Sequence, residues 1–439
     1  MTDLNAVLDA ARKAGAQQAE AYQVANEETP VMFEANRLKE LNSRHTSGVA
    51  LRVIADGRIG FASSTRPDDV DDLVSAAMET APFGPEAHFD FPKQAEAPVV
   101  ETFDPATEAF AVDDMIEAGQ TLIDAVRKVE PELLCDAQLR RVVGEVTLVN
   151  SNGANVSYRG SMLMAWLHGS LIRGTDMLFV GDVDASVSPD LDTARIERTV
   201  TWQLEHARNL ANMRTAEMPV IFTSSGVADA LVMPLTLAFS GRLVQQGQSP
   251  LAGKLGDEVY DARLSVHDDA TLPMRPASRP FDDEGVASRR TPLVEQGAVR
   301  SFMYDLQSAG LAKAASTGSA ERSLTSQPNI STTSLIIAPG ETTFEEMVKG
   351  VKEGLIVEDL MGAGQGNVMG GDFSGNVLLG YKIENGEIVG RVKDTMVAGN
   401  VHEALASVSA IGAEARWING TILTPPLLFD RMAVSAKAS

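Results

Sequence analysis

The sequence predicts an α+β protein, in which helices pack beside antiparallel strands in an N-terminal domain and a β-rich C-terminal domain follows. Strand-like apolar runs flank Asp56-Gly57, Asn152-Gly153, Gln296-Gly297 and Asn385-Gly386, and such pairs are typical of tight hairpin turns. Runs with helical spacing stand between these hairpins, so an antiparallel arrangement is favoured over a parallel sheet.

The first half of the chain is expected to alternate short helices with long strands. Asp3 can cap a first helix in which Leu4, Val7 and Leu8 repeat at helical spacing, and Gly15 ends it. A second helix is expected to start at Pro67-Asp68-Asp69, because proline suits the first helical turn. Further helices are predicted over 112–128 and 191–213, and strands over 19–25, 30–41, 48–54, 58–62, 135–149, 155–164 and 165–187.

Two stretches carry the remaining organisation of this half. Residues 83–105 are Pro-rich and aperiodic, which predicts a surface excursion. We place the domain boundary at Ala216-Glu217-Met218, so that the predicted domains are 1–216 and 217–439.

A central helix is predicted directly after the boundary. It would run from Thr223 to Gly241, follow a short strand at 219–222, and be buried, because Asp229 is its only charged residue. Pro234 removes one backbone donor and should kink it, and Gly241 can close its end. Later strands are predicted over 291–294, 299–304, 355–361, 376–383, 387–392 and 427–432, a helix over 401–407, and loops over 245–257 (mobile) and 314–333.

Composition limits the classes of function. The 439 residues include 60 acidic and 37 basic side chains, a formal net charge of −23, which opposes binding to nucleic acid and to acidic membranes. Cys135 is the only cysteine, so no intrachain disulfide can form. The N-terminal residues lack the basic and apolar regions of a signal peptide, and no apolar run is long enough to span a membrane. We expect a soluble cytoplasmic protein.

Several apparent motifs are interpreted as structural. His402-Glu403 begins like a zinc-peptidase helix, but Ala406 stands where the second His is needed, and a solvated helix start is expected. The run Gly362 to Asn367 resembles a dinucleotide fingerprint without a following helix, so close backbone approach is its expected role. Cys135 is expected to be a buried, inert thiol. Asp282-Asp283-Glu284 could hold a cation or act as an acid–base pair, but adjacent side chains diverge, and a structural role is favoured.

The order of elements resembles that of the TldD/TldE (PmbA) family. The resemblance rests on the strand and capped apolar helix, on Phe281 to Val286, and most specifically on 370–376, 381–388 and 398–400. The family was long described as modulators of DNA gyrase and is now interpreted as a two-subunit zinc peptidase. The resemblance covers most of the chain.

The resemblance implies that this chain is the TldE (PmbA) type, without catalytic or metal-binding residues. The TldD-type helix carries a His-Glu-x-x-x-His motif, and the matching positions here are about Val232, Met233 and Leu237, which are all apolar. TldD-type subunits also supply a zinc-ligand Cys near the C-terminus, and residues 415–419 contain none. Zinc is therefore expected only in the partner subunit.

The function expected from this resemblance is that of a non-catalytic subunit of a TldD/TldE-type metallopeptidase that binds unfolded peptides. Gly370, Gly371, Asp372, Phe373 and Ser374 are candidate peptide contacts. The expected partner is a TldD-type catalytic subunit, or a second copy of this chain in its absence. Two alternatives remain open: a regulatory protein-binding module for gyrase or a toxin–antitoxin pair, and a stand-alone metal-independent hydrolase.

Overall fold

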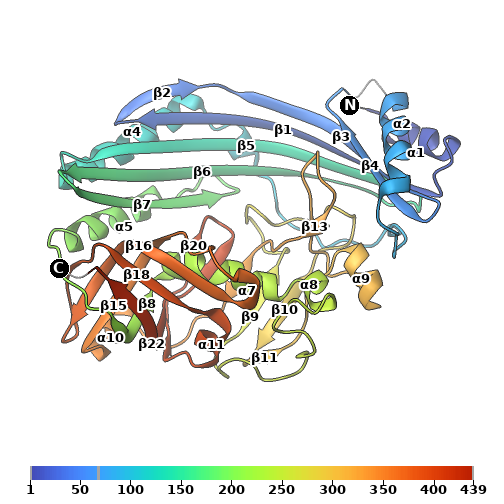
Figure 1. The fold of residues 1–439 in the computed structure, drawn as a ribbon. Coiled ribbons are helices and arrows are strands. Elements are labelled where there is room, and N and C mark those ends of the chain that lie inside the picture. Colours follow the sequence, from blue (N-terminus) through green and yellow to red (C-terminus); the bar gives the residue numbers. More distant parts are fainter. Residues whose placement is uncertain (1, 67–69, 438–439) are drawn as a thin grey trace.

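The computed structural model describes residues 2–66 and 70–437. Its first half is a seven-stranded antiparallel sheet in the order β4-β3-β1-β5-β6-β7, with β2 paired to the end of β1. The strands are β1 (Gln18–Glu34), β2 (Arg37–Leu41), β3 (Arg44–Ala55), β4 (Arg58–Ser64), β5 (Leu134–Asn150), β6 (Asn155–Arg173) and β7 (Asp176–Ser186). The longest strands extend across the second half of the chain (Figure 1).

Helices cover the two ends of this sheet. Near one end, α1 (Leu4–Lys13) and α2 (Val70–Thr80) pack on β1, β3 and β4 and bury a small apolar cluster (Figure 1). Towards the other end, α4 (Val112–Val129) packs on β1 and β5, and α5 (Thr193–His206) packs on α4 and β7. The short helices α3 (Pro105–Glu108) and η1 (Ala81–Phe83), the latter a 3₁₀ turn, lie in the connections.

The second half contains a ring of strands around a buried aromatic centre. β15 pairs with both β8 and β16, which closes the order β15-β8-β22-β18-β16 on itself. Phe222, Phe373 and Phe429 meet edge to face, with ring centroids 5.8–5.9 Å apart. The ring strands are β8 (Ala216–Phe222), β15 (Glu353–Met361), β16 (Asp372–Glu384), β18 (Thr395–Asn400) and β22 (Leu427–Ala436). Two further strands, β17 (Glu387–Arg391) and β19 (Ala410–Ile411), pair with β16 and β22.

A six-stranded sheet, in the order β11-β10-β9-β14-β21-β20, and a small two-stranded sheet complete this half. The larger sheet contains β9 (Val266–Asp269), β10 (Arg290–Glu295), β11 (Ala298–Val299), β14 (Leu335–Ile337), β20 (Arg416–Ile418) and β21 (Ile422–Thr424); the smaller contains β12 (Ala320–Glu321) and β13 (Asn329–Ile330). The helices of the second half are α6 (Ser224–Val227), the π-helical η2 (Ala228–Val232), α7 (Met233–Ala238), α8 (Gly241–Gln245), α9 (Leu306–Ala312), α10 (Phe344–Gly350), the 3₁₀ turn η3 (Val368–Gly370) and α11 (Val401–Ala406).

The α+β fold class is confirmed, and so are the predicted hairpins. Most strand pairs are antiparallel, although β8 with β15 and β14 with β21 are parallel. The predicted start of α2 at residues 67–69 lies outside the described residues. β8 begins at Ala216, and the division of the chain into domains at this point stays a prediction.

Three predicted elements in the first half have different bounds. The predicted break at 26–29 is wrong, because β1 continues through these polar residues with β3 on one side and β5 on the other. The turn instead falls at Ala35 and Asn36, which both have left-handed φ. The predicted strand over 165–187 is the end of β6 plus β7. Helix α5 covers only Thr193–His206 and is shorter than the predicted 191–213.

In the second half, two predictions are wrong in detail. The central helix is not one element to Gly241: α7 ends at Ala238, and Gly241 starts α8 instead. The stretch 314–333, predicted to be a structureless loop, contains β12 and β13 and buries Thr317, Ser319 and Arg322.

Candidate functional site

The candidate site is built on the central helix, residues 224–238, called the site helix below. The Thr223 hydroxyl accepts a hydrogen bond from the Gly226 amide (3.3 Å) and so caps the start. Residues 228–232 then form a π-helical turn directly before Pro234. Proline cannot donate a backbone hydrogen bond, and π turns often occur at functional positions in helices. The predicted disturbance at Pro234 therefore takes the form of a π segment.

The three positions matched to a zinc motif do not face one centre in the same way. Val232 is buried, Leu237 is half-buried, and Met233 is 54% exposed. Val232 and Leu237 have no metal-binding atom, and the Met233 thioether is not among the usual ligands of Zn²⁺. Within residues 2–66 and 70–437, no group of three or more His, Cys, Asp or Glu side chains is placed to hold a metal ion. The residues present do not fit zinc.

Met233 lies beside a segment that carries two further exposed methionines. The segment between β15 and η3 lies beside α7, and the Met233 sulfur is 3.4 Å from the position that a Cβ on Gly364 would take. Met361 and Met369, at the ends of this segment, are 56% and 46% exposed. We call Met233, Met361 and Met369 the methionine rim. Methionine is flexible and polarisable, so such a surface can adapt to apolar groups of different shapes.

Two carboxyl groups lie next to the rim. Asp229 Oδ2 accepts a hydrogen bond from the Leu360 amide (3.2 Å), and its carboxyl is within hydrogen-bonding distance of Asp359. Although part of Asp229 is open to solvent, crowding by protein atoms and the neighbouring Asp359 charge raise its pKa to about 7. Burial also raises the pKa of Asp359, which the charge of His168 opposes. This pair can share a proton near neutral pH.

Sequence reasoning missed this pair, because its two members and the neighbouring His168 come from three separate parts of the chain. Asp229 is on η2, Asp359 is on β15, and His168 is on β6 of the first half, where its ring stacks between Trp166 and Phe179. No local spacing links the three residues. The charge of Asp229 inside an apolar helix was the one available signal.

The candidate peptide-contact segment 370–374 is only partly accessible. Phe373 is buried in the ring of strands. Ser374 pairs with Ala398 on one side and bridges Gly364 on the other, so no free strand edge is left at that residue. Gly371 has a left-handed φ of 95°, and the Asp372 carboxylate accepts a hydrogen bond from Asn400 Nδ2 (2.8 Å). Peptide contact by this segment stays a prediction.

The acidic triplet Asp282-Asp283-Glu284 is almost completely buried, and its side chains diverge as expected. The Asp282 carboxylate accepts a hydrogen bond from the Ala320 amide (3.0 Å), and the Asp283 carboxylate accepts one from the Arg322 amide (2.8 Å). The Glu284 carboxylate accepts a hydrogen bond from Arg52 Nη1 (2.7 Å), and this bond joins the second half of the chain to β3 of the first half. Burial raises the pKa of Asp282 to about 6 and that of Glu284 to about 7, while nearby arginines oppose both shifts. The triplet has the structural role that was favoured.

A cavity of about 850 Å³ between the first-half sheet and the second half adjoins this network. Arg322 lies over the Tyr22 ring (4.1 Å from the ring centre) and forms an ion pair with Glu20 (2.9 Å), but its guanidinium nitrogens form no hydrogen bonds. These nitrogens are sealed from solvent, so a ligand in the cavity cannot reach them in this conformation. Besides many hydroxyl groups, the cavity lining includes Arg279, Asp283, Glu321 and Arg322, of which Glu321 is exposed.

The remaining motifs carry little chemistry. Cys135 is buried, and burial raises the pKa of its thiol to about 11, which suits an inert side chain. The expectation of a solvated His402 is wrong: its Nδ1 lies 2.8 Å from the Tyr260 hydroxyl, and burial lowers its pKa to about 4. Within the run 362–367, Gly364 forms a β-bridge to Ser374. The run is followed by the single 3₁₀ turn η3 and not by an α-helix.

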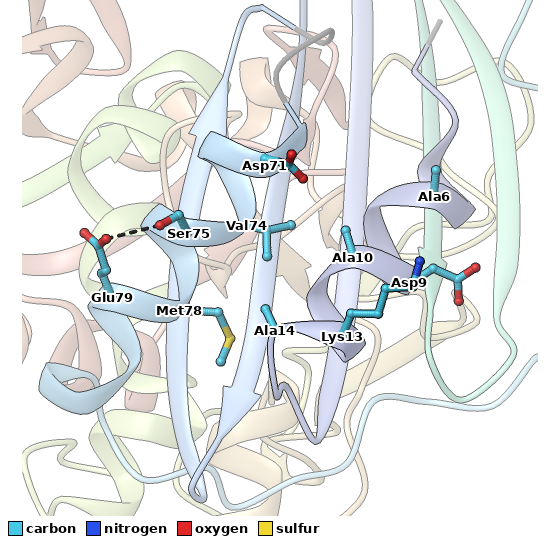
Figure 2. A pocket seen from close by; sticks show the side chains of 10 residues that line it. All are labelled: Ala6, Asp9, Ala10, Lys13, Ala14, Asp71, Val74, Ser75, Met78 and Glu79. Carbon is cyan, nitrogen blue, oxygen red and sulfur yellow. Dashed lines mark hydrogen bonds between the residues drawn. The ribbon is translucent and has the colours of Figure 1, made fainter.

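A groove of about 790 Å³ lies between α1 and α2, away from the site helix (Figure 2). Its floor consists of aliphatic side chains such as Ala10 and Val74, and Asp9, Lys13 and Glu79 stand at its edges. The only hydrogen bond drawn within it joins Ser75 to Glu79 (3.1 Å). The groove lacks converging reactive groups, so the site helix remains the candidate site. None of the helices in the described part of the chain is long and apolar enough to cross a membrane.

Comparisons with known proteins agree on one class. Residues 215–436 match the model of the PmbA/TldA metallopeptidase C-terminal domain, and residues 19–81 match that of PmbA/TldA metallopeptidase domain 1. The fold and these matches define a chain of the metallopeptidase type named in those models. The protein belongs to the PmbA/TldD family.

Individual relatives are distant but extend over much of the chain. A metalloprotease of Methanothermobacter thermautotrophicus is 25% identical over 88% of this chain and 86% of its own. A metalloprotease PmbA homolog of Haemophilus influenzae is 26% identical over 70% of this chain and 69% of its own. The crystal structure of TldE from Thermococcus kodakarensis, 24% identical, matches with a TM-score of 0.88 over 99% of this chain and all of that one. This last likeness establishes the fold.

Proposed function

We propose that this chain is a non-catalytic, peptide-binding subunit that works with a zinc-bearing TldD-type partner in the cytoplasm. One observation carries the proposal: the site helix is retained, but Val232, Met233 and Leu237 stand at the positions matched to the zinc motif. Residues 415–419 offer no cysteine, and Arg416 in that segment donates to Ser225 Oγ (2.6 Å) instead. The chain therefore supplies surface and shape rather than a metal centre.

The methionine rim supports a peptide-binding role. Its exposed thioether side chains can pack against varied apolar residues, and Gly364 beside Met233 is exposed as well. The net charge of −23 makes a nucleic acid an improbable ligand on electrostatic grounds. An unfolded polypeptide with exposed apolar side chains fits this surface best.

Co-expression with a TldD-type protein from the same genome tests the proposal. We expect the two chains to co-purify and to cleave an unstructured peptide together in an EDTA-sensitive manner, while this chain alone is inactive and holds no stoichiometric zinc. The variant Met233→Glu, which adds a single carboxylate to the site helix, should also contain no zinc. Absence of a complex at micromolar concentration, or zinc-dependent cleavage by this chain alone, would contradict the proposal.

A metal-independent hydrolase is the second candidate, and the Asp229–Asp359 pair is the observation that favours it. Two carboxyl groups that share a proton can act as general acid and general base. In that case the isolated chain would cleave peptides in the presence of EDTA, and Asp229→Asn would abolish cleavage. The same assay therefore separates the two candidates.

A further inference from the structure

A further pocket, smaller than the cavity and the groove described above, opens at the start of the site helix. It has a volume of about 310 Å³, at the lower end of the usual 300–1,000 Å³ range of small-molecule sites. Its wall combines aromatic, acidic, basic and hydroxyl groups from five different elements. The lining residues that supply these groups are Arg198, Trp202, Ser224, Phe344, Glu358 and Arg416.

The aromatic wall is held rigidly. The Trp202 ring packs on His206, with 4.3 Å between ring centres, and meets Tyr381 edge to face at 5.2 Å. Phe344 approaches the same indole edge to face at 6.2 Å. These contacts fix the indole, so the wall is preformed for an apolar group.

Glu358 supplies a carboxylate at the pocket with only 6% of the residue exposed. Gln203 Nε2 donates to its Oε1 (3.2 Å), but within the described part of the chain no Lys or Arg forms an ion pair with Glu358. Burial raises its pKa, which the charge of Arg416 opposes. A buried carboxylate without an ion-pair partner is costly, and a ligand ammonium would relieve that cost.

The basic groups divide into one that is engaged and one that is available. Arg416 donates to Ser225 Oγ (2.6 Å) and Thr199 Oγ1 (3.3 Å) and lies 3.5 Å from Asp182. Arg198, in contrast, has a 68% exposed side chain and a loose pair with Asp192 (3.6 Å). Such surface pairs contribute little, so Arg198 can turn to a ligand anion at small cost.

Ser224 completes the polar wall. The residue is 6% exposed and lines the pocket, and no hydrogen bond of its hydroxyl is found among the described residues. A nearly buried hydroxyl without a partner favours a ligand or water with which it can bond.

We propose that this pocket binds a free α-amino acid with a bulky apolar side chain, such as phenylalanine. The ammonium group would lie against Glu358, the carboxylate against Arg198 and the Ser224 hydroxyl, and the side chain against Trp202 and Phe344. Only a small zwitterion with an apolar group satisfies all three walls at once. Free amino acids are end products of complete peptide breakdown, so the pocket would sense products of that class of reaction. This proposal concerns the isolated chain and does not require the catalytic partner.

Calorimetric titration of the full chain with four compounds tests the ligand class. We expect L-phenylalanine to bind at one site, and L-phenylalaninamide, N-acetyl-L-phenylalanine and glycine each to bind at least about 10-fold more weakly, because each lacks one of the three groups. No saturable binding of L-phenylalanine at millimolar concentration would overturn the proposal. Equal binding of N-acetyl-L-phenylalanine would also overturn it, since that compound has no ammonium group.

Two variants locate the site. Arg198→Gln changes an exposed side chain and should weaken L-phenylalanine binding about 10-fold while leaving L-phenylalaninamide unchanged. Arg12→Gln, an equally exposed change on α1, is the matched control and should change neither. Glu358→Gln should reduce the preference for L-phenylalanine over its N-acetyl derivative, with thermal unfolding as a check on the fold. Equal affinity of wild type and Arg198→Gln for L-phenylalanine would place the ligand elsewhere and sink the proposal.

Discussion

Two acidic groups in the second half of the chain differ in what neutralises them. Asp282, Asp283 and Glu284 receive backbone amides and lie in a buried network with Arg52, Arg279 and Arg322. Asp229 and Asp359 lie at the site helix next to each other, and no Lys or Arg of the described ranges forms an ion pair with either one. Both groups nevertheless have raised pKa values.

The difference separates a structural role from an available one. In the first group, each carboxylate has a fixed partner, so removing a partner leaves a buried charge and destabilises the fold. In the second group, the charges are unpaired and partly open, so a proton, a ligand or a solvent cation can exchange there. The most acidic motif in the sequence is thus the less accessible of the two groups.

The largest expected effect comes from breaking the buried network. Arg52→Met keeps an apolar stem against Phe89 and Phe91 but leaves Glu20 and Glu284 without their shared partner. Removal of one partner from a buried ion pair costs about 3–5 kcal/mol, and we expect a loss of this size in chemical denaturation. Because Arg52 and Glu284 belong to different halves, the unfolding transition should also become less cooperative.

Arg12→Met provides the control for this prediction, since Arg12 pairs with Asp9 on an exposed helix face. Its cost should stay below about 1 kcal/mol. If Arg52→Met were no more costly than this control, the network would not hold the two halves together.

A smaller loss is expected when the zinc motif is written onto the site helix. The triple variant Val232→His, Met233→Glu and Leu237→His places a polar ring at a buried position and leaves Pro234 between the intended ligands. Each buried polar group without a partner costs about 1–3 kcal/mol, so the variant should be destabilised and hold no zinc. Elemental analysis after dialysis, with unfolding curves, measures both effects. Met233→Glu alone, at an exposed position, should be nearly neutral, whereas EDTA-sensitive cleavage by the triple variant would refute this view of the helix.

The hairpins could be predicted from the sequence because their turns need unusual backbone angles. Asp56 and Gly57, and likewise Asn385 and Gly386, have left-handed φ values, which favour Asn, Asp and Gly. The polar residues 26–29 were misleading, because the hydrogen-bonded strands on both sides hold β1 there, although only Thr29 of the four is buried. An alternating pattern reports burial and is insensitive to pairing.

The candidate site was much less predictable. The apolar character of Val232, Met233 and Leu237 is visible in the sequence, and so is the proline between them. The pairing of Asp229 with Asp359, and the convergence of Glu358 with Trp202 and Arg198, depend on tertiary packing of distant elements. No residue spacing encodes such contacts, so only the structure reveals them.

The pH dependence of stability sharpens the comparison further. The pKa of Asp229 in the folded chain, about 7, is above its ordinary value of 3.8, so the folded state binds the proton more tightly than the unfolded state. Its favourable contribution is therefore complete below pH 4 and is lost as the pH rises through about 7. After solvent screening we expect about 1 kcal/mol at most.

Asp229→Asn should reduce the fall in stability between about pH 4 and pH 7, because the amide side chain does not titrate in this range. Urea denaturation at several pH values measures the slope. Asp9→Asn on α1 serves as the control for the change in net charge, which also affects stability. Identical slopes for Asp229→Asn and wild type would mean that folding does not raise the pKa of Asp229.

The smallest effect on stability, with a clear effect on binding, is expected at the methionine rim. Met233→Ser shortens a side chain that is 54% exposed, so its stability cost should be within about 0.5 kcal/mol. If peptide binding uses the rim, as proposed, this change removes apolar contact area and should weaken capture of a labelled unstructured peptide several-fold in fluorescence anisotropy. Met177→Ser on β7 is the matched control, because Met177 is 53% exposed but lies at the hairpin between β6 and β7. Binding should therefore fall for Met233→Ser alone. An equal fall in both variants would indicate nonspecific adhesion to exposed apolar side chains, and no fall in either would place the peptide on another face of the molecule.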